Sequence, residues 1–175
     1  LGKPRVVDFR STLDDKEFIL YLSSLEKGSE HPLADAVLNL AKIQNIKVDE
    51  CTDVIAVAGQ GIQGIVNGKT IQAGSLHWLN ESGIQLSPSQ TKALGKWENE
   101  GYTIIHTASN EEWIGMVAIS DTLRKESKSI INKLKHNGLK VYLLTGDRKE
   151  SGEHFAGQLG IENIHSELLP HEKVE

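Results

Sequence analysis

The spacing of apolar residues changes several times along the chain, which indicates that helices alternate with strands. Phe18, Leu22 and Leu25 recur at helical intervals and predict a helix over residues 14–27. A second apolar stripe, begun by a proline at the position that best suits a helix start, predicts a helix over residues 32–44.

Short apolar runs follow these two helices. Runs at 54–58, 62–66 and 70–73 predict strands. Asn67-Gly68 separates the last two runs and is typical of a tight hairpin turn. This stretch therefore predicts antiparallel structure.

A further helix and hairpin are predicted next. Ser87 and Gln90 have the spacing of a capping box and predict a helix that ends before Gly101. Runs at 102–108 and 113–119 then predict two more paired strands.

The pattern changes after Ser120. We predict a helix over 124–136, a strand over 140–144, a helix over 149–159 and a short strand near Ile164. A strand, a helix and a second strand in this order imply a parallel sheet. The fold class is therefore an antiparallel α+β part flanked by helices, joined to half of a Rossmann-like α/β part.

Composition limits the classes of function. The chain has 175 residues, a formal net charge of -5 and 38% hydrophobic residues, the balance of a globular protein. No basic face of the kind that binds nucleic acid is evident. No apolar run approaches the roughly 18 residues that cross a bilayer, so we expect this piece to lie in water. Cys51 is the single cysteine, which excludes an internal disulfide.

Residues 59–64 spell G-Q-G-I-Q-G, a literal G-x-G-x-x-G. The dinucleotide-binding version needs a helix directly after the glycines. A predicted strand and hairpin follow here, so we reject that interpretation. Two others stay open: a tight turn, or a loop where missing side chains let a ligand approach the backbone at Gly59, Gly61 and Gly64.

Glu30 and His31 precede Pro32 at the predicted start of the second helix. A ligand there would meet backbone N–H groups and an imidazole that can stack on a flat base. The alternative is that both side chains only cap the helix. The residues alone favour capping.

Thr145, Gly146 and Asp147 follow a predicted parallel strand, at the edge where open α/β sheets bind ligands. Because Thr145 can offer a hydroxyl to a phosphate, we favour a functional role over an ordinary turn. Lys173 is predicted near the same edge and could neutralise a phosphate, although a lone lysine is most often a surface residue.

The remaining histidines lack the i, i+4 pairing of a metal site, and we predict no metal ligands. We interpret them as exposed or at the edge of the core: His77, His106, His136, His154 and His165. The three tryptophans are predicted to be core residues: Trp78, Trp97 and Trp113.

Five motifs occur in one order along nearly the whole chain. They are S-E-H-P-L at 29–33, G-x-G-x-x-G at 59–64 with Gly74-Ser75 after it, D-T-L-R at 121–124, L-T-G-D at 144–147 and L-P-H-E-K at 169–173. This order resembles the heavy-metal-transporting P-type ATPases of the P1B, copper-pump type.

The resemblance implies an adenine nucleotide site in the first part of the chain. His31 would stack on the adenine ring and Glu30 would lie near it. Gly59, Gly61, Gly64 and Gly74 would give the nucleotide room.

The resemblance also implies a phosphoryl-transfer site. Thr145 and Lys173 would stabilise charge on the transferred phosphoryl group, and Asp121 and Asp147 would position the nucleotide at a hinge near Ser120. The γ-phosphate would pass to an aspartate carboxylate and form an acyl phosphate.

The domains follow from the same resemblance. Residues 1–10 would end a segment of the phosphorylation domain, 11–120 would form the nucleotide-binding domain, and 121–175 would form part of a HAD-type phosphorylation domain. The family's D-K-T-G-T-L-T and its Mg²⁺-holding G-D-G-x-N-D are absent from these 175 residues. We therefore expect the isolated chain to bind ATP without turning it over.

The implied function of the parent is ATP-driven export of a transition metal, most of all Cu(I), at the cytoplasmic face of a membrane. Its partners would be ATP, Mg²⁺ and the transported ion, with no nucleic acid. The alternatives are a zinc or cadmium pump, a soluble HAD-type phosphohydrolase, and a nucleotide-binding module without chemistry. Ser75, where copper pumps often have Asn, leaves the metal open.

Overall fold

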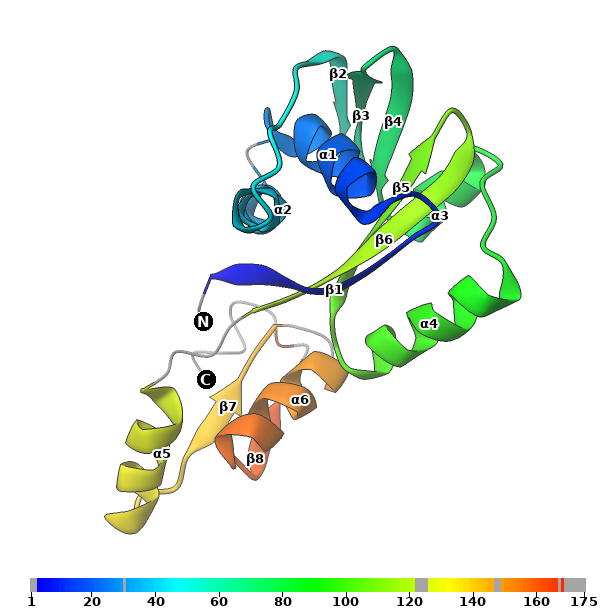
Figure 1. The fold of residues 1–175 in the computed structure, drawn as a ribbon. Coiled ribbons are helices and arrows are strands. Elements are labelled where there is room, and N and C mark those ends of the chain that lie inside the picture. Colours follow the sequence, from blue (N-terminus) through cyan, green and yellow to red (C-terminus); the bar gives the residue numbers. More distant parts are fainter. Residues whose placement is uncertain (1–2, 30, 122–125, 147–148, 167, 169–175) are drawn as a thin grey trace.

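The computed structural model describes residues 3–29, 31–121, 126–146, 149–166 and 168. Its first part is built on a six-stranded antiparallel sheet with the strand order β1-β6-β5-β4-β3-β2 (Figure 1). The strands are β1 (Pro4–Ser11), β2 (Cys51–Val57), β3 (Gly61–Val66), β4 (Lys69–Gly74), β5 (Thr103–Ser109) and β6 (Glu112–Asp121).

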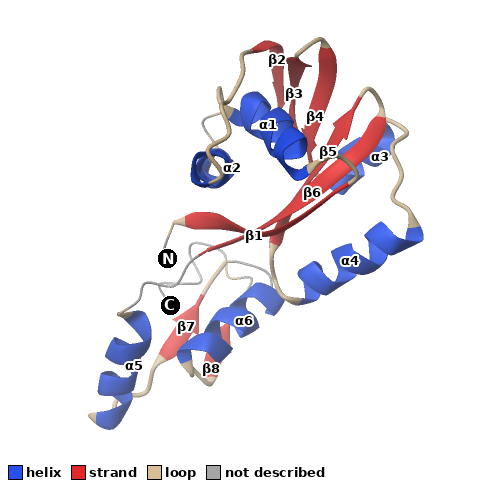
Figure 2. Ribbon diagram, viewed as in Figure 1, coloured by secondary structure: helices blue, strands red, loops and turns tan. Residues whose placement is uncertain are grey.

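Helices cover both faces of this sheet (Figure 2). α1 (Asp15–Glu26) contacts β3 and β4, and α2 (Pro32–Ile43) contacts α1 and β1. α3 (Leu76–Glu81) and α4 (Pro88–Asn99) contact β5 from the other side. We call the α1 side the inner face and the α3 side the outer face.

The alternation of side chains along the strands builds two hydrophobic layers. On the inner face, Ile62, Val66 and Ile71 are buried with Phe18 and Leu22 of α1. The outer face carries two smaller clusters, one around Trp78 and Leu79 of α3 and one around Leu94 and Trp97 of α4. Trp78 and Trp97 are buried as predicted, and Trp113 is partly buried between these clusters.

The predicted helix boundaries are confirmed where capping residues mark them. The Ser87 hydroxyl accepts from the Gln90 N–H, and the Gln90 side chain accepts from the Ser87 N–H at 2.7 Å, which completes the capping box of α4. Pro32 opens α2 as predicted.

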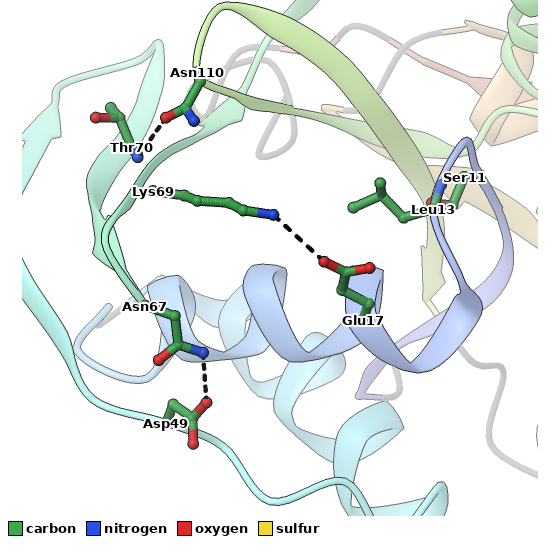
Figure 3. Close-up of polar contacts among 8 residues, drawn as sticks. All are labelled: Ser11, Leu13, Glu17, Asp49, Asn67, Lys69, Thr70 and Asn110. Atoms are coloured by element: carbon green, nitrogen blue, oxygen red, sulfur yellow. Dashed lines mark hydrogen bonds and ion pairs between the residues drawn. The ribbon is translucent and has the colours of Figure 1, made fainter.

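Polar contacts hold the far end of the inner face, around the β3–β4 hairpin (Figure 3). Asn67 donates to the Asp49 carboxylate at 2.9 Å, and the Lys69 ammonium lies 3.5 Å from the Glu17 carboxylate of α1. These contacts fix the hairpin to the start of α1 and to the segment that leads into β2.

The second part of the fold is the predicted β-α-β unit. It contains α5 (Ser127–His136), β7 (Tyr142–Leu144), α6 (Lys149–Leu159) and β8 (Asn163–His165). β7 and β8 pair in parallel, and α6 contacts β8. No helix in the described ranges is long and apolar enough to cross a bilayer.

Two elements were not predicted from the sequence. Residues 4–11, of which 4–10 were assigned to the end of a phosphorylation-domain segment, form β1 and pair with β6, with Pro4 opposite Asp121. α3 is short and lies directly after a strand, so its helical periodicity spans too few residues to detect.

Candidate adenine nucleotide site

His31 is the N-cap residue of α2. Its ring Nδ1 accepts a hydrogen bond from the Leu33 N–H at 3.2 Å, so the capping role predicted from sequence is present. The side chain is exposed. Capping uses one ring nitrogen and leaves the imidazole faces open to a ligand.

The first turn of α2 offers little to a phosphate. Pro32 has no N–H, the Leu33 N–H is bonded to His31 Nδ1, and the Ala34 N–H is bonded to the His31 carbonyl at 2.9 Å. The expectation that a ligand would meet unused N–H groups here is wrong for these residues. This position suits a flat base better than an anion.

Glu26 lies beside His31 and was missed by sequence reasoning. It is the last residue of α1, and only 5% of it is exposed. Burial raises the pKa of its carboxyl, while a hydrogen bond from Ser29 and the charge of His31 act in the opposite direction. A signal was available, since Glu26 continues the i, i+4 series of Phe18 and Leu22 on the buried stripe of α1.

Ser29 connects Glu26 to the backbone of His31. Its hydroxyl oxygen accepts from the His31 N–H at 3.3 Å, and its own N–H donates to the Glu26 carbonyl at 3.0 Å. Ser29 is also a side-chain hydrogen-bond partner of the Glu26 carboxyl. The result is a compact unit, Glu26–Ser29–His31, with a buried acceptor and an exposed ring.

The glycine segment forms a tight turn from β2 into β3, one of the two structures that the sequence left open, and not a strand-to-helix dinucleotide loop. Gly59 has φ of 72°, and nothing lies within 4 Å of the position of an added Cβ. The Gln60 N–H donates to the Val57 carbonyl at 3.0 Å and closes the turn. We call residues 59–61 the glycine turn.

Gly64 faces the inner core. A Cβ there would lie 3.2 Å from Leu25 Cδ1 and against the Cys51 sulfur. The absence of a side chain lets the end of α1, and therefore Glu26, approach β3. Packing alone requires glycine at this position.

Gly61 and Gly74 are direct partners across β3 and β4 on the outer face. A Cβ on Gly61 would lie 2.7 Å from Trp78 Cζ3, and one on Gly74 would lie 2.9 Å from Trp78 Cε3. Such approaches are not tolerated by real Cβ atoms, so the pair admits the indole of Trp78.

The predicted phosphoryl-transfer residues lie elsewhere. Thr145 follows β7 at the carboxyl edge of the parallel strands, where its N–H donates to the His165 carbonyl at 2.9 Å. Asp121 ends β6. Asp147, Lys173 and Glu30 lie outside the described residues. The structure thus places His31 and Thr145 on different parts of the fold.

One histidine differs from its prediction. His106 is 2% exposed on the outer face of β5, because Gly74 and Met116 are its strand partners there and helices cover that face. Burial lowers its pKa to about 4, and its Nδ1 has no hydrogen-bond partner among the described residues. Within the same residues, no three His, Cys, Asp or Glu side chains gather as metal ligands.

Comparison with known proteins decides the family. Residues 3–175 match the family of haloacid dehalogenase-like hydrolases. The chain belongs to this family. Within this hydrolase family, it is 38% identical over 172 residues to a copper-exporting P-type ATPase of Staphylococcus saprophyticus. It is 34% identical over 174 residues to the copper-exporting P-type ATPase B of Archaeoglobus fulgidus.

Solved structures give the same relationship for this chain. A zinc-transporting PIB-type ATPase in its E2.Pi state matches 98% of the chain with a TM-score of 0.85 and 27% identity. The catalytic domain of the CPx-ATPase CopB-B matches with a TM-score of 0.72 and 28% identity, over 59% of that domain structure. These matches confirm the predicted fold class and the resemblance to metal-transporting P-type ATPases.

The matches cover nearly all of this chain but only a small part of each relative. They cover 98% and 99% of this chain, but 21% of the Staphylococcus protein and 24% of the Archaeoglobus protein. The chain therefore spans about a quarter or less of the curated relatives it matches.

Proposed function

We propose that this chain is the ATP-binding part of a metal-transporting P-type ATPase, and that Glu26, Ser29 and His31 hold the adenine. The observation that carries the proposal is the buried Glu26 carboxyl beside the exposed ring of His31. A buried carboxyl without a strong ion pair is costly, which points to a functional role.

The chemistry of the unit fits adenine. The His31 imidazole offers a flat surface for stacking on the base. The Glu26 carboxylate can accept a hydrogen bond from the exocyclic amino group of adenine. Guanine carries a carbonyl oxygen at the corresponding position, which a carboxylate would repel. We therefore expect the site to prefer ATP over GTP.

The glycine turn supports an approach of the nucleotide to the backbone. Gly59 is open on the side where a Cβ would stand. Gly61, Gly64 and Gly74 contribute indirectly, since packing requires them. Glu30 remains a proposed neighbour of the base on the strength of the S-E-H-P-L resemblance alone.

The phosphates would be handled by the second part of the fold. Thr145 follows β7 at the edge where α/β sheets bind ligands. With Lys173 it would stabilise charge on the phosphoryl group, and Asp121 and Asp147 would position the nucleotide. The aspartate that accepts the γ-phosphate would belong to the intact parent, as would the residues for Mg²⁺.

The parent is proposed to couple aspartyl-phosphate chemistry to metal export at the cytoplasmic face of a membrane. The copper-exporting relatives favour Cu(I) as the transported ion. A zinc pump is the second candidate, because a zinc-transporting ATPase matches the fold at a TM-score of 0.85. We retain 11–120 as the nucleotide-binding domain and 121–175 as part of the phosphorylation domain.

Amide chemical shifts test where the nucleotide binds. ¹⁵N-labelled chain is titrated with ATP and, separately, with GTP. We expect shifts at residues 26–33 and in the glycine turn, at lower concentrations of ATP than of GTP. Shifts confined to other regions, or equal responses to both nucleotides, would contradict the proposal.

A further inference from the structure

The indole of Trp78 lies over the pair Gly61 and Gly74, at the end of the glycine turn. Trp78 is 8% exposed and packs with Leu79, Ile84 and Ala108, with Val57 at its border. Val57 is the last residue of β2 before the turn. The cluster around the indole therefore includes residues from the strands on both sides of the turn.

Hydrogen bonds tie the helix that carries the indole to the turn through Ser75. The Ser75 N–H donates to the Gln60 carbonyl at 2.8 Å. The Ser75 hydroxyl caps α3 by accepting from the backbone N–H of Trp78 at 3.2 Å. One residue thus anchors Trp78 on one side and the centre of the glycine turn on the other.

We propose that Trp78 is a positioning residue that fixes the glycine turn for nucleotide binding. This inference rests on the proposed function, in which the turn approaches the nucleotide. In this role the Trp78 side chain acts by packing on Gly61 and Gly74, while the backbone bond from Ser75 to Gln60 joins the start of α3 to the turn. Gly61 and Gly74 then serve affinity indirectly, because any larger residue at either position displaces the indole or the opposite strand.

The packing around the glycine pair explains how Trp78 fixes the turn. We call the space above Gly61 and Gly74, where both side chains are missing, the notch. Two adjacent glycines leave the backbone of β3 and β4 without side-chain packing on the outer face. The flat indole fills this space and removes the freedom that glycine would otherwise give to the chain. A smaller side chain at position 78 leaves the notch empty, so the turn samples conformations that do not bind.

Trp97 provides a matched control. It is a tryptophan of α4, 3% exposed on the same outer face, and it packs with Leu94, Met116 and Ala118. Replacing Trp78 or Trp97 by Leu removes a comparable buried volume from the same layer. Only the first change removes the group that covers the glycine pair.

The experiment compares Trp78→Leu with Trp97→Leu at low temperature, after circular dichroism has established that both variants are folded. We expect Trp78→Leu to weaken ATP binding roughly fivefold or more, and Trp97→Leu to change it less than about twofold. Trp78→Phe keeps an aromatic ring over the glycines and should recover most of the affinity. Equal affinity in the two Leu variants would overturn the proposal.

Hydrogen exchange of the Ser75 amide gives a second readout that needs no nucleotide. We expect it to exchange faster in Trp78→Leu than in Trp97→Leu, while the Val66 amide in the same hairpin responds equally to both. An unchanged Ser75 amide overturns the positioning role even if ATP affinity falls.

Hydrogen exchange of the Ser75 amide also separates a failure of the proposed function from a failure of the positioning role of Trp78. If the unmodified chain binds no ATP, the proposed function and the nucleotide role of Trp78 both fail, although Ser75 exchange still reports the link to the turn. If Trp78→Leu does not fold, Trp78→Phe and the 5-fluorotryptophan-labelled chain replace it. In the labelled chain, the ¹⁹F chemical shift of Trp78 should change with ATP concentration along the same binding curve as the amide signals of the glycine turn. An unchanged ¹⁹F shift overturns the proposal.

Discussion

The rings of Tyr102 and His154 meet edge to face, with centroids 5.9 Å apart and an interplanar angle of 79°. Tyr102 lies between α4 and β5, and His154 lies on α6. The contact therefore joins the first part of the fold, which carries the proposed adenine site, to the β-α-β unit, in which Thr145 follows β7.

Loss of this contact should loosen the arrangement of the two parts. An aromatic pair contributes about 0.5–1.5 kcal/mol beyond burial. Tyr102→Leu should therefore increase the population of molecules in which the two parts have separated roughly two- to twelvefold. Spin labels at Asn39→Cys on α2 and Lys133→Cys on α5, in a Cys51→Ser background, measure the distance distribution. We expect it to broaden.

Tyr142→Leu is the matched control for this change. Tyr142 stacks on His165, at 6.3 Å between centroids, within the two-stranded sheet. Its loss removes a tyrosine–histidine contact without touching the junction. Equal broadening in both variants would show that the Tyr102 contact does not hold the two parts together.

His31 should contribute both to stability and to affinity, and two variants separate the contributions. His31→Ala removes the cap and the ring, so we expect a loss of about 0.5–2 kcal/mol of stability and a five- to thirtyfold loss of ATP affinity, from roughly 1–2 kcal/mol of stacking. His31→Asn keeps a capping acceptor, so stability should largely return while affinity stays low. Recovery of affinity in His31→Asn would rule out stacking.

Glu26→Gln tests the buried carboxyl. Its pKa is raised by burial, so the folded chain holds a proton there above the ordinary value of 4.5 and loses stability as the pH rises through this raised pKa. The variant should lack this loss, and its ATP affinity should fall roughly tenfold or more with the lost charged acceptor. Glu17→Gln, on the same helix but half-exposed, should leave ATP affinity unchanged. Similar ATP affinities for the two variants would remove Glu26 from the site.

His106 should make the fold sensitive to acid. Its pKa is about 4 in the folded chain and about 6.5 when unfolded. Between these values the unfolded chain binds a proton that the folded chain excludes, so stability falls as the pH falls, by about 3 kcal/mol in full. Urea unfolding from pH 7 to 4.5 should show this loss reduced in His106→Leu. The exposed His77→Leu should behave like the unmodified chain.

The sequence predicts the local structure well where one residue type has one geometric use. Pro32 marks the start of α2, and the Ser87–Gln90 capping box marks α4. β1 escaped prediction because its partner β6 is distant in the sequence. Strand pairing of this kind depends on contacts that no local pattern encodes.

The site was predicted only in part, for a similar reason. His31 was identified, but its cap and its ring were treated as alternatives, whereas the geometry allows both. Glu26 becomes a neighbour of His31 only once the chain turns between α1 and α2. Gly61 and Gly74 are thirteen positions apart, and their common role depends on the register of β3 and β4 and on Trp78.

The most direct measurement is a calorimetric titration of the 175-residue chain with ATP, once with Mg²⁺ and once with a chelator. The proposed adenine site contacts the base, and no residue of this chain is proposed to hold Mg²⁺. The account therefore predicts saturable heat in both titrations, with dissociation constants that agree within about twofold. The His31→Asn chain should give much weaker binding under both conditions. An absence of heat at millimolar ATP, or heat that appears only with Mg²⁺, would contradict the account.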